Sequence, residues 1–231
     1  MTDYGDPSVD LIVELAQPSA HDRVLDYACG MGRAAVAVAF SVSEVHAVDE
    51  QPEALDEARR LSAEIHADNI VFKLVDLYAL PFPDGHFSLI ICRNALHRLP
   101  EPVLALGEMA RVMSDRGRIV LHEACVDKVS DRAFNELARL REPVHRRYYL
   151  RDELDGIVKK AKLQVGERRE HRVTVDLDYW IEAAAVPAEK AEIIRTRLQD
   201  LSVEAQAAMD LAFADRLVSF SYDALALRLQ R

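Results

Sequence analysis

Three acidic side chains stand at the carboxyl ends of three successive apolar segments. They are Asp26, Asp49 and Asp76, in the segments 23–27, 44–49 and 69–76. Carboxylates attract cations and accept hydrogen bonds from hydroxyl and amino groups, although any one of these acids could simply cap a helix or a turn. Ligands of open α/β sheets bind at the carboxyl ends of the strands. Together the three acids predict one ligand site at that edge of a sheet.

A loop with two glycines follows the first segment and leads into an alanine-rich stretch. The loop is Ala28-Cys29-Gly30-Met31-Gly32, and Arg33-Ala34-Ala35 follows it. Glycine lets a ligand approach bare backbone and permits a positive φ. The GxGxxA spacing also matches the dinucleotide-binding fingerprint, and a tight turn without a ligand would use the same residues. The spacing alone leaves the ligand open.

The carboxylate of Asp26 favours a cationic ligand at this loop. An unpaired carboxylate a few ångströms from a pyrophosphate costs on the order of several kcal/mol when both are desolvated, which argues against NAD or FAD. S-adenosylmethionine carries an ammonium and a sulfonium group where a dinucleotide carries phosphates. Asp49, 23 residues after Asp26, could accept both ribose hydroxyls of such a ligand. Asp76 could accept a hydrogen bond from the adenine amine.

Four stretches of the chain, in order, resemble the successive motifs of one enzyme family. They are VLDYACGMGRAA, HAVDEQPEALDEAR, FKLVDLYALPFPDGHFSLIICRNALHRLPEP and RIVLHE. The set resembles the class I S-adenosylmethionine-dependent methyltransferases, most closely the small-molecule group that includes the ubiquinone and menaquinone methyltransferases. The resemblance covers residues 20–125 well and the remainder weakly. It implies S-adenosylmethionine as the cofactor and O- or C-methylation of a small-molecule acceptor.

The resemblance also implies roles for individual cofactor-binding residues. Asp26, Ala28, Gly30 and Gly32 would border the methionyl part, Asp49 and Gln51 the ribose, Asp76 and Leu77 the adenine, and Arg93 and Asn94 the sulfonium side. Ala28 departs from the family, which most often has glycine at this position. Its methyl group either fits the cofactor pocket or narrows it.

The alternation of short apolar runs with amphipathic stretches predicts an α/β fold. The expected strands are 23–27, 44–49, 69–76, 87–92, 118–123, 163–175 and 216–229, with a turn at 114–117 before the fifth. The resemblance implies a Rossmann-like, doubly wound seven-stranded sheet of order 3-2-1-4-5-7-6, with strand 7 antiparallel and helices on both faces. We expect a single methyltransferase domain over 1–231. Residues 1–125 would form the cofactor-binding core, and 126–231 an acceptor-side lid with a helical insertion at about 176–209 and the final strands.

Two histidines are candidates for proton removal from a hydroxyl acceptor. Methyl transfer is an in-line displacement that depends mainly on positioning in a dry pocket, so a base is optional. His97 follows the fourth strand, and its replacement by alanine would then reduce turnover more than cofactor affinity. His145 lies on the segment 143–149, which could fold over the pocket as a lid. Either histidine could instead be an ordinary residue at a helix start, and Tyr4 could help to close the pocket.

No metal site is expected near the proposed cofactor. Cys92-Arg93-Asn94 offers a single amide after the fourth strand, and His122-Glu123 lacks the HExxH spacing of zinc proteases. Three cysteines without a CxxC spacing indicate reduced thiols in a cytoplasmic protein.

Charge and hydropathy exclude several classes of partner. The chain has 39 acidic and 29 basic residues, a formal charge of -10, which disfavours nucleic acid as the main partner. The Asn/Asp-Pro-Pro-aromatic motif of base-amino methyltransferases is also absent after the fourth strand. No apolar run approaches the roughly 18 residues of a membrane span, so no membrane association is expected. The residues after 126 could supply a homodimer contact.

Two other functions remain compatible with these motifs. The protein could bind the cofactor and catalyse a non-methylating reaction such as cyclisation, or it could be a subunit that works only with a partner chain. Release of S-adenosylhomocysteine in the presence of acceptors would distinguish methyl transfer from the first alternative. Gel filtration with light scattering and a cofactor titration of the isolated protein would test the second.

Overall fold

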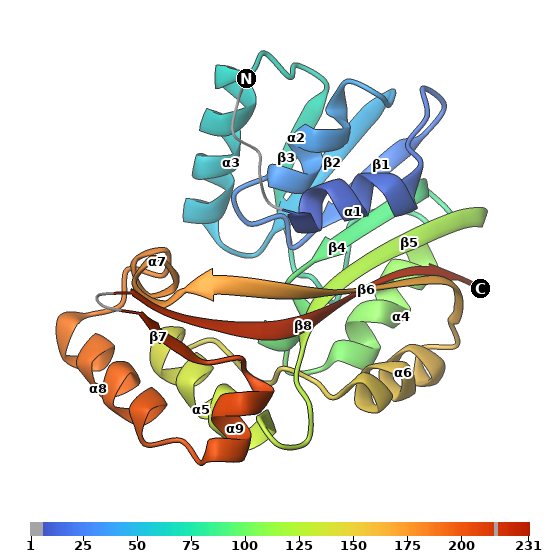
Figure 1. Cartoon of the computed structure of the whole chain (residues 1–231). Helices are drawn as coiled ribbons and strands as arrows, with labels where there is room; N and C mark the ends of the chain where they lie inside the picture. Colours follow the sequence, from blue (N-terminus) through green and yellow to red (C-terminus); the bar gives the residue numbers. More distant parts are fainter. Residues whose placement is uncertain (1–6, 215–216) are drawn as a thin grey trace.

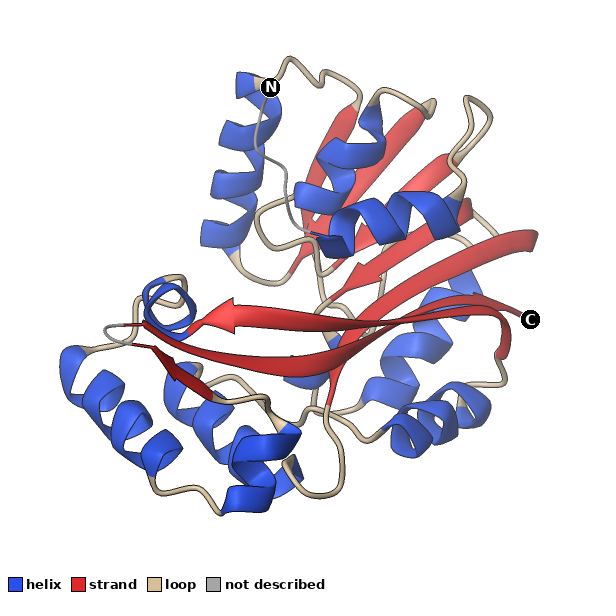
Figure 2. Ribbon diagram, viewed as in Figure 1, coloured by secondary structure: helices blue, strands red, loops and turns tan. Residues whose placement is uncertain are grey.

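The computed structural model describes residues 7–214 and 217–231, which form an eight-stranded sheet with helices on both faces (Figures 1 and 2). The strand order is β3-β2-β1-β4-β5-β8-β6, and the short strand β7 pairs with β8. The strands are β1 Arg23–Tyr27, β2 Glu44–Asp49, β3 Ile70–Leu74, β4 Phe87–Arg93, β5 Met113–Cys125, β6 Gln164–Asp176, β7 Ala212–Ala214 and β8 Leu217–Gln230.

The predicted fold class and strand order are confirmed. Strands β1 to β5 pair in parallel, and β8 runs antiparallel to both β5 and β6. Strand β8 is thus the predicted antiparallel seventh strand. One additional strand, β7, was not expected from the sequence. It forms because β5 pairs with β8 only from Asp223 onward, which leaves an open edge at Leu217–Ser219 that β7 fills.

The turn predicted at 114–117 is wrong. Strand β5 begins directly after the helix, at Met113, and includes these residues. Met113 pairs with Phe87 and Arg118 with Leu89, so a register shift in the β4–β5 ladder accommodates the extra residues. The local sequence could not show this, because the irregularity depends on the partner strand.

Helices cover the two faces of the sheet in separate groups (Figure 2). On one face lie α1 Pro7–Ala16, α2 Arg33–Ala39 and α3 Pro52–Glu64; on the other lie α4 Pro102–Val112 and α6 Arg151–Lys160. Side chains alternate along buried strands, so Val24 and Ile91 pack with the first group, whereas Leu25 and Ile90 pack with the second. A single turn of 3-10 helix, η1 Leu96–Arg98, follows β4.

A third apolar cluster lies beside the C-terminal end of β6 and the N-terminal end of β8. It is supported by α5 Asp131–Arg141, α7 Leu177–Glu182, α8 Ala188–Gln199 and α9 Val203–Ala208. The rings of Phe134, Trp180 and Phe220 pack together in this cluster, with Trp180 and Phe220 in a T-shaped contact at 5.2 Å. This cluster therefore gives the C-terminal part its own apolar support at the end of the sheet.

Strands β6 and β8 extend beyond the rest of the sheet at this end. The β5–β8 ladder ends at Cys125 and Asp223, whereas the β6–β8 ladder continues to Asp176 and Ser219. We call the projecting part, residues 173–176 and 219–222, the overhang. It lies at the same edge of the sheet as the carboxyl ends of β1 and β4, because β6 is antiparallel to β8 and therefore parallel to β5.

Candidate functional site

A cavity of about 190 Å³ lies at the carboxyl ends of the first four strands. Its walls come from the loops after β1, β2, β3 and β4 and from the segment that precedes α6. The lining residues are Ala28, Asp49, Glu50, Gln51, Leu77, Tyr78, Ala95, Arg98, Leu99, Pro100, Val144 and Arg146. The structure thus brings together four predicted cofactor residues, and the segment predicted as a lid contributes the two neighbours of His145.

Asp49 joins this cavity to the glycine loop. Its carboxylate is buried, with Oδ2 accepting the backbone N–H of Gly30 (2.9 Å) and Oδ1 that of Gln51 (3.0 Å). A carboxylate offers about four acceptor positions, so two hydrogen bonds leave capacity for ligand hydroxyls. The residue therefore fixes the loop and can still bind a ligand.

Three positions in the glycine loop have left-handed backbone conformations. The φ angles are +53° at Ala28, +52° at Gly30 and +75° at Gly32. A Cβ atom at Gly32 would lie 2.9 Å from the Cβ of Ala58 in α3. Gly32 is thus required both for its φ angle and for the close approach of α3.

Replacement of Ala28 by glycine is expected to stabilise the protein. An L-residue in the left-handed region costs about 1 to 2 kcal/mol, and glycine offsets part of that gain through its greater unfolded-state entropy. The net increase in the free energy of unfolding should be about 0.5 to 1 kcal/mol in urea titrations. Ala183→Gly is the matched control, because Ala183 has an ordinary φ of -60° and should lose stability. A loss in both variants would show that the loop conformation carries no strain.

Asp26 is a buried acid directly beneath the loop. Its Oδ2 accepts the backbone N–H of Ala35 in the first turn of α2 (2.9 Å). Burial raises the pKa of Asp26 to about 7, against the lowering effects of the Ala35 hydrogen bond and the positive charge of Arg93. Arg93 itself donates to the hydroxyl of Ser8 in α1 (3.0 Å). A cationic ligand near Asp26 would stabilise its ionised form.

Asn94 is held at the end of β4 by the neighbouring strand. Its backbone N–H donates to the carbonyl of His122, and its Oδ1 lies 2.8 Å from Nδ1 of that histidine. The ring of His122 lies 5.2 Å from that of His171 in β6. The side chain of Asn94 is thus oriented by β5.

Asp76 and Leu77 separate in the structure. Asp76 is exposed, and its Oδ1 accepts the backbone N–H of Tyr78 (2.8 Å), a turn-capping arrangement. Leu77 is buried, its carbonyl accepts the hydroxyl of Tyr27 (2.7 Å), and its side chain lines the cavity. Leu77 can therefore offer apolar contact to a ligand, while the adenine hydrogen bond of Asp76 stays a prediction.

Glu123 is a buried acid whose role the sequence did not reveal. Its Oε1 accepts the backbone N–H groups of Ala95 and Leu96 (2.6 Å each), and its Oε2 lies 2.8 Å from Nδ1 of His97. A carboxylate oxygen accepts hydrogen bonds, so it pairs with the His97 tautomer that carries its proton on Nδ1. The only sequence signal was an acid at the end of the fifth predicted strand. Glu123 fixes the loop that carries Ala95 into the cavity wall.

His97 also connects this loop to the segment before α6. Its carbonyl accepts the backbone N–H groups of Arg146 (2.8 Å) and Arg147 (3.1 Å). His97 and His145 are both buried, with ring centroids 5.5 Å apart, and neither lines the cavity. Nε2 of His145 lies 2.9 Å from Oδ1 of Asn135. Burial, with nearby positive charge, lowers the pKa of His145 to about 3, so it is a weak proton acceptor at neutral pH.

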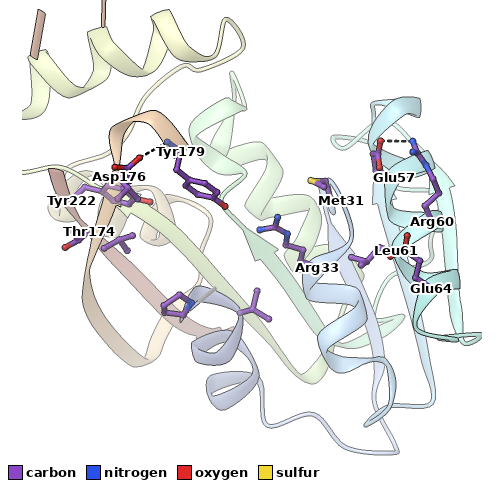
Figure 3. Close-up of a pocket in the computed structure, with 14 residues that line it drawn as sticks. Met31, Arg33, Glu57, Arg60, Leu61, Glu64, Thr174, Asp176, Tyr179 and Tyr222 are labelled. Atoms are coloured by element: carbon purple, nitrogen blue, oxygen red, sulfur yellow. Dashed lines mark hydrogen bonds and ion pairs between the residues drawn. The ribbon is translucent and has the colours of Figure 1, made fainter. Parts of the chain in front are cut away.

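A second cavity, of about 720 Å³, begins at Met31 of the glycine loop (Figure 3). One wall is formed by α2 and α3 with the start of α1, and the facing wall by the overhang and α7. The lining residues are Pro7, Val9, Met31, Arg33, Glu57, Arg60, Leu61, Glu64, Val173, Thr174, Val175, Asp176, Tyr179 and Tyr222. The sequence did not predict this cavity, because its walls are far apart in the chain.

Other expectations concern metals, membranes and Tyr4. Within 7–214 and 217–231, no cluster of three or more His, Cys, Asp or Glu side chains is arranged to hold a metal ion. No helix in that part of the chain is long and apolar enough to cross a membrane. Tyr4 lies outside the described residues.

Comparisons with known proteins identify the family of this chain. A family model described as a methyltransferase domain matches residues 18–185. The chain belongs to this methyltransferase family. It is an S-adenosylmethionine-dependent methyltransferase, with S-adenosylmethionine as its cofactor.

Individual relatives support the same family. The chain is similar to an uncharacterized methyltransferase, YcgJ, of Bacillus subtilis, with 33% identity over 85% of this chain and 78% of the relative. The crystal structure of YcgJ superposes with a TM-score of 0.90, covering 97% of this methyltransferase and 98% of that chain at 30% identity. A demethylmenaquinone methyltransferase of Thermus thermophilus is 36% identical over 48% of this chain and 51% of its own.

Proposed function

We propose that this methyltransferase acts on a small-molecule acceptor, by O- or C-methylation. The observation that carries the proposal is the 190 Å³ cavity. Its walls include the carboxylate of Asp49 and apolar side chains, and its lining residue Ala28 is two positions from the buried acid Asp26. The similarity to a demethylmenaquinone methyltransferase, over about half of each chain, supports a small organic acceptor. Three further expectations stay predictions: the cytoplasmic location, the homodimer and the absence of a nucleic-acid partner. Light scattering tests the homodimer.

The residues of the site fit the cofactor chemically. Asp49 offers unused acceptor positions for ribose hydroxyls, and Leu77 and Leu99 offer apolar surface to adenine. Asp26, with its pKa raised to about 7, gains an opposite charge when a cation binds close to it. When bound, S-adenosylmethionine supplies an activated methyl group on a positively charged sulfur.

The protein's own contribution to transfer is positioning. Asp49 and the glycine loop orient the ligand, and the loop at Ala95 and the segment at Val144 enclose it. In-line displacement gains most from such alignment in a water-poor site. We propose that His97 and Glu123 hold the loop at Ala95 and the segment at Val144 together. Proton removal by His97 stays a prediction, which the variant Glu123→Gln tests.

Cofactor affinity is expected to increase as the pH rises from about 6 to about 8. Asp26 has a pKa of about 7 in the free protein, so it loses its proton across this range and then attracts the cationic ligand. Calorimetry should show up to about a tenfold stronger binding of S-adenosylmethionine at the upper pH. In Asp26→Asn the profile should be flat. A slope that persists in that variant would assign the dependence to another group.

The raised pKa of Asp26 also makes the stability of the cofactor-free protein depend on pH. Because the folded pKa of Asp26 lies above the usual aspartate value, this group contributes most stability at low pH and loses it as the pH rises from about 4 to about 7. Because cofactor affinity increases from about pH 6 to about pH 8, bound cofactor should raise the unfolding temperature more at pH 8 than at pH 6.

Methyl transfer itself is tested by product formation. Purified protein, S-adenosylmethionine and a panel of phenols, quinols and carboxylic acids should release S-adenosylhomocysteine with at least one acceptor. Binding of the cofactor without release for any acceptor would favour a non-methylating reaction, and absence of binding would favour a partner-dependent subunit.

A further inference from the structure

The large cavity between α3 and the overhang has the position and lining of an acceptor site. We propose that it binds the methyl acceptor, and that it selects an uncharged aromatic molecule which stacks against Tyr179. This inference rests on the proposed function, because it assigns the second substrate of the same transfer.

The overhang gives this cavity a fixed wall. Val173 and Val175 lie on β6 beyond the end of the β5–β8 ladder, and both line the cavity. Trp180 and Phe220 anchor the overhang within the third apolar cluster. A rigid wall on one side and an opening on the other are what a preformed ligand site requires.

The glycine loop borders both cavities. Ala28 and Asp49 line the smaller cavity, while Met31 and Arg33, at the end of the loop and the start of α2, line the larger one. A molecule in the larger cavity is therefore next to the loop that borders the cofactor. Its volume, about 720 Å³, lies in the range of pockets for drug-sized ligands, whereas about 190 Å³ leaves little room beyond part of the cofactor.

The charges around the larger cavity disfavour an anionic acceptor. Its charged residues are Arg33, Glu57, Arg60, Glu64 and Asp176, three acids and two bases. Arg60 is paired with Glu57 at 2.6 Å within α3, which leaves one base, Arg33, against two acids, Glu64 and Asp176. A carboxylate or phosphate in this cavity would face an excess of acid.

Aromatic and aliphatic side chains supply the remaining surface. Tyr179 is 62% exposed and Met31 51% exposed, so both side chains present open surface to the cavity that they line. Figure 3 shows Tyr179 projecting from α7 toward the side that carries Arg33 and Leu61. Oδ1 of Asp176 accepts the backbone N–H of Tyr179 (2.9 Å), which fixes the start of α7. A planar ligand can therefore stack on a ring with a fixed backbone.

The test uses two probes of the same shape and different charge. Binding of 2-naphthol and of 2-naphthoate to the protein saturated with S-adenosylhomocysteine is measured by calorimetry. We expect 2-naphthol to bind at least about tenfold more tightly than 2-naphthoate. Tyr179→Ala should weaken 2-naphthol binding by about tenfold, the amount that one aromatic contact contributes. Leu61→Trp, which fills the cavity from α3, should abolish it.

Matched controls separate this inference from the proposed function. Phe40→Ala removes an aromatic ring that is 72% exposed and lies outside both cavities, so it should leave probe binding unchanged. S-adenosylhomocysteine affinity should stay within about twofold in Tyr179→Ala and Leu61→Trp, which also shows that they fold.

Three results would overturn the inference while leaving the methyltransferase assignment intact. They are tighter binding of 2-naphthoate, no binding of 2-naphthol to the wild type, and unchanged 2-naphthol affinity in both cavity variants. Failure of the wild type to bind S-adenosylhomocysteine would instead count against the proposed function.

Discussion

Asp49→Ala is expected to weaken S-adenosylhomocysteine binding by about 1 to 3 kcal/mol, and the structure favours the upper end of that range. The carboxylate offers acceptors for ribose hydroxyls, and the variant leaves those donors without a partner. It also releases the backbone N–H groups of Gly30 and Gln51, so the glycine loop loses its connection to β2. The loss therefore combines a missing ligand contact with a less ordered loop.

Calorimetry with two companion variants makes this prediction specific. Asp49→Asn keeps one oxygen acceptor and should lose less affinity than Asp49→Ala. Asp56→Ala is the control, because Asp56 is an exposed acid on α3 whose hydrogen bond is to Arg59 (2.8 Å). Unchanged affinity in Asp49→Ala would remove the ribose assignment.

Three strands of the parallel core were predictable from their apolar runs. Strands β1, β2 and β4 are buried on both faces, and their apolar runs gave boundaries within one residue of those observed. The bounds of β6 and β8 were also predicted to within one residue, but their projection beyond β5 and the strand β7 were not. Their pairing depends on where β5 stops along β8, and a long-range register leaves no local pattern in the sequence.

The sequence predicted those parts of the candidate site that depend on backbone conformation or on a position at the end of a strand. The glycine loop and Asp49 follow from residue type and from position at a strand end. Asp76 has the same signal as Asp49, yet it caps a turn in solvent, because Leu77 takes the buried position beside it. Sequence spacing could not distinguish these two acids, since the difference is set by the direction of one side chain.

Glu123→Ala is expected to cause the largest loss of stability among these variants. The change leaves the backbone N–H groups of Ala95 and Leu96 and the Nδ1 of His97 without their acceptor in the interior. Each buried orphaned donor costs about 1 to 3 kcal/mol, so the total should be roughly 3 kcal/mol or more in denaturant titrations. Cofactor binding should weaken as well, because the loop at Ala95 lines its cavity. A loss below about 1 kcal/mol would show that water replaces these contacts.

Glu123→Gln decides whether His97 positions the loop or removes a proton. The glutamine oxygen can still accept from Ala95 and Leu96, while its amide group donates toward Nδ1 of His97 and shifts the ring proton to Nε2. His97 would then keep its contacts but lose the lone pair that a base needs. We expect turnover within about threefold of wild type, since a positioning role survives the tautomer change. A fall of about a hundredfold or more, with cofactor affinity unchanged, would instead identify His97 as the base.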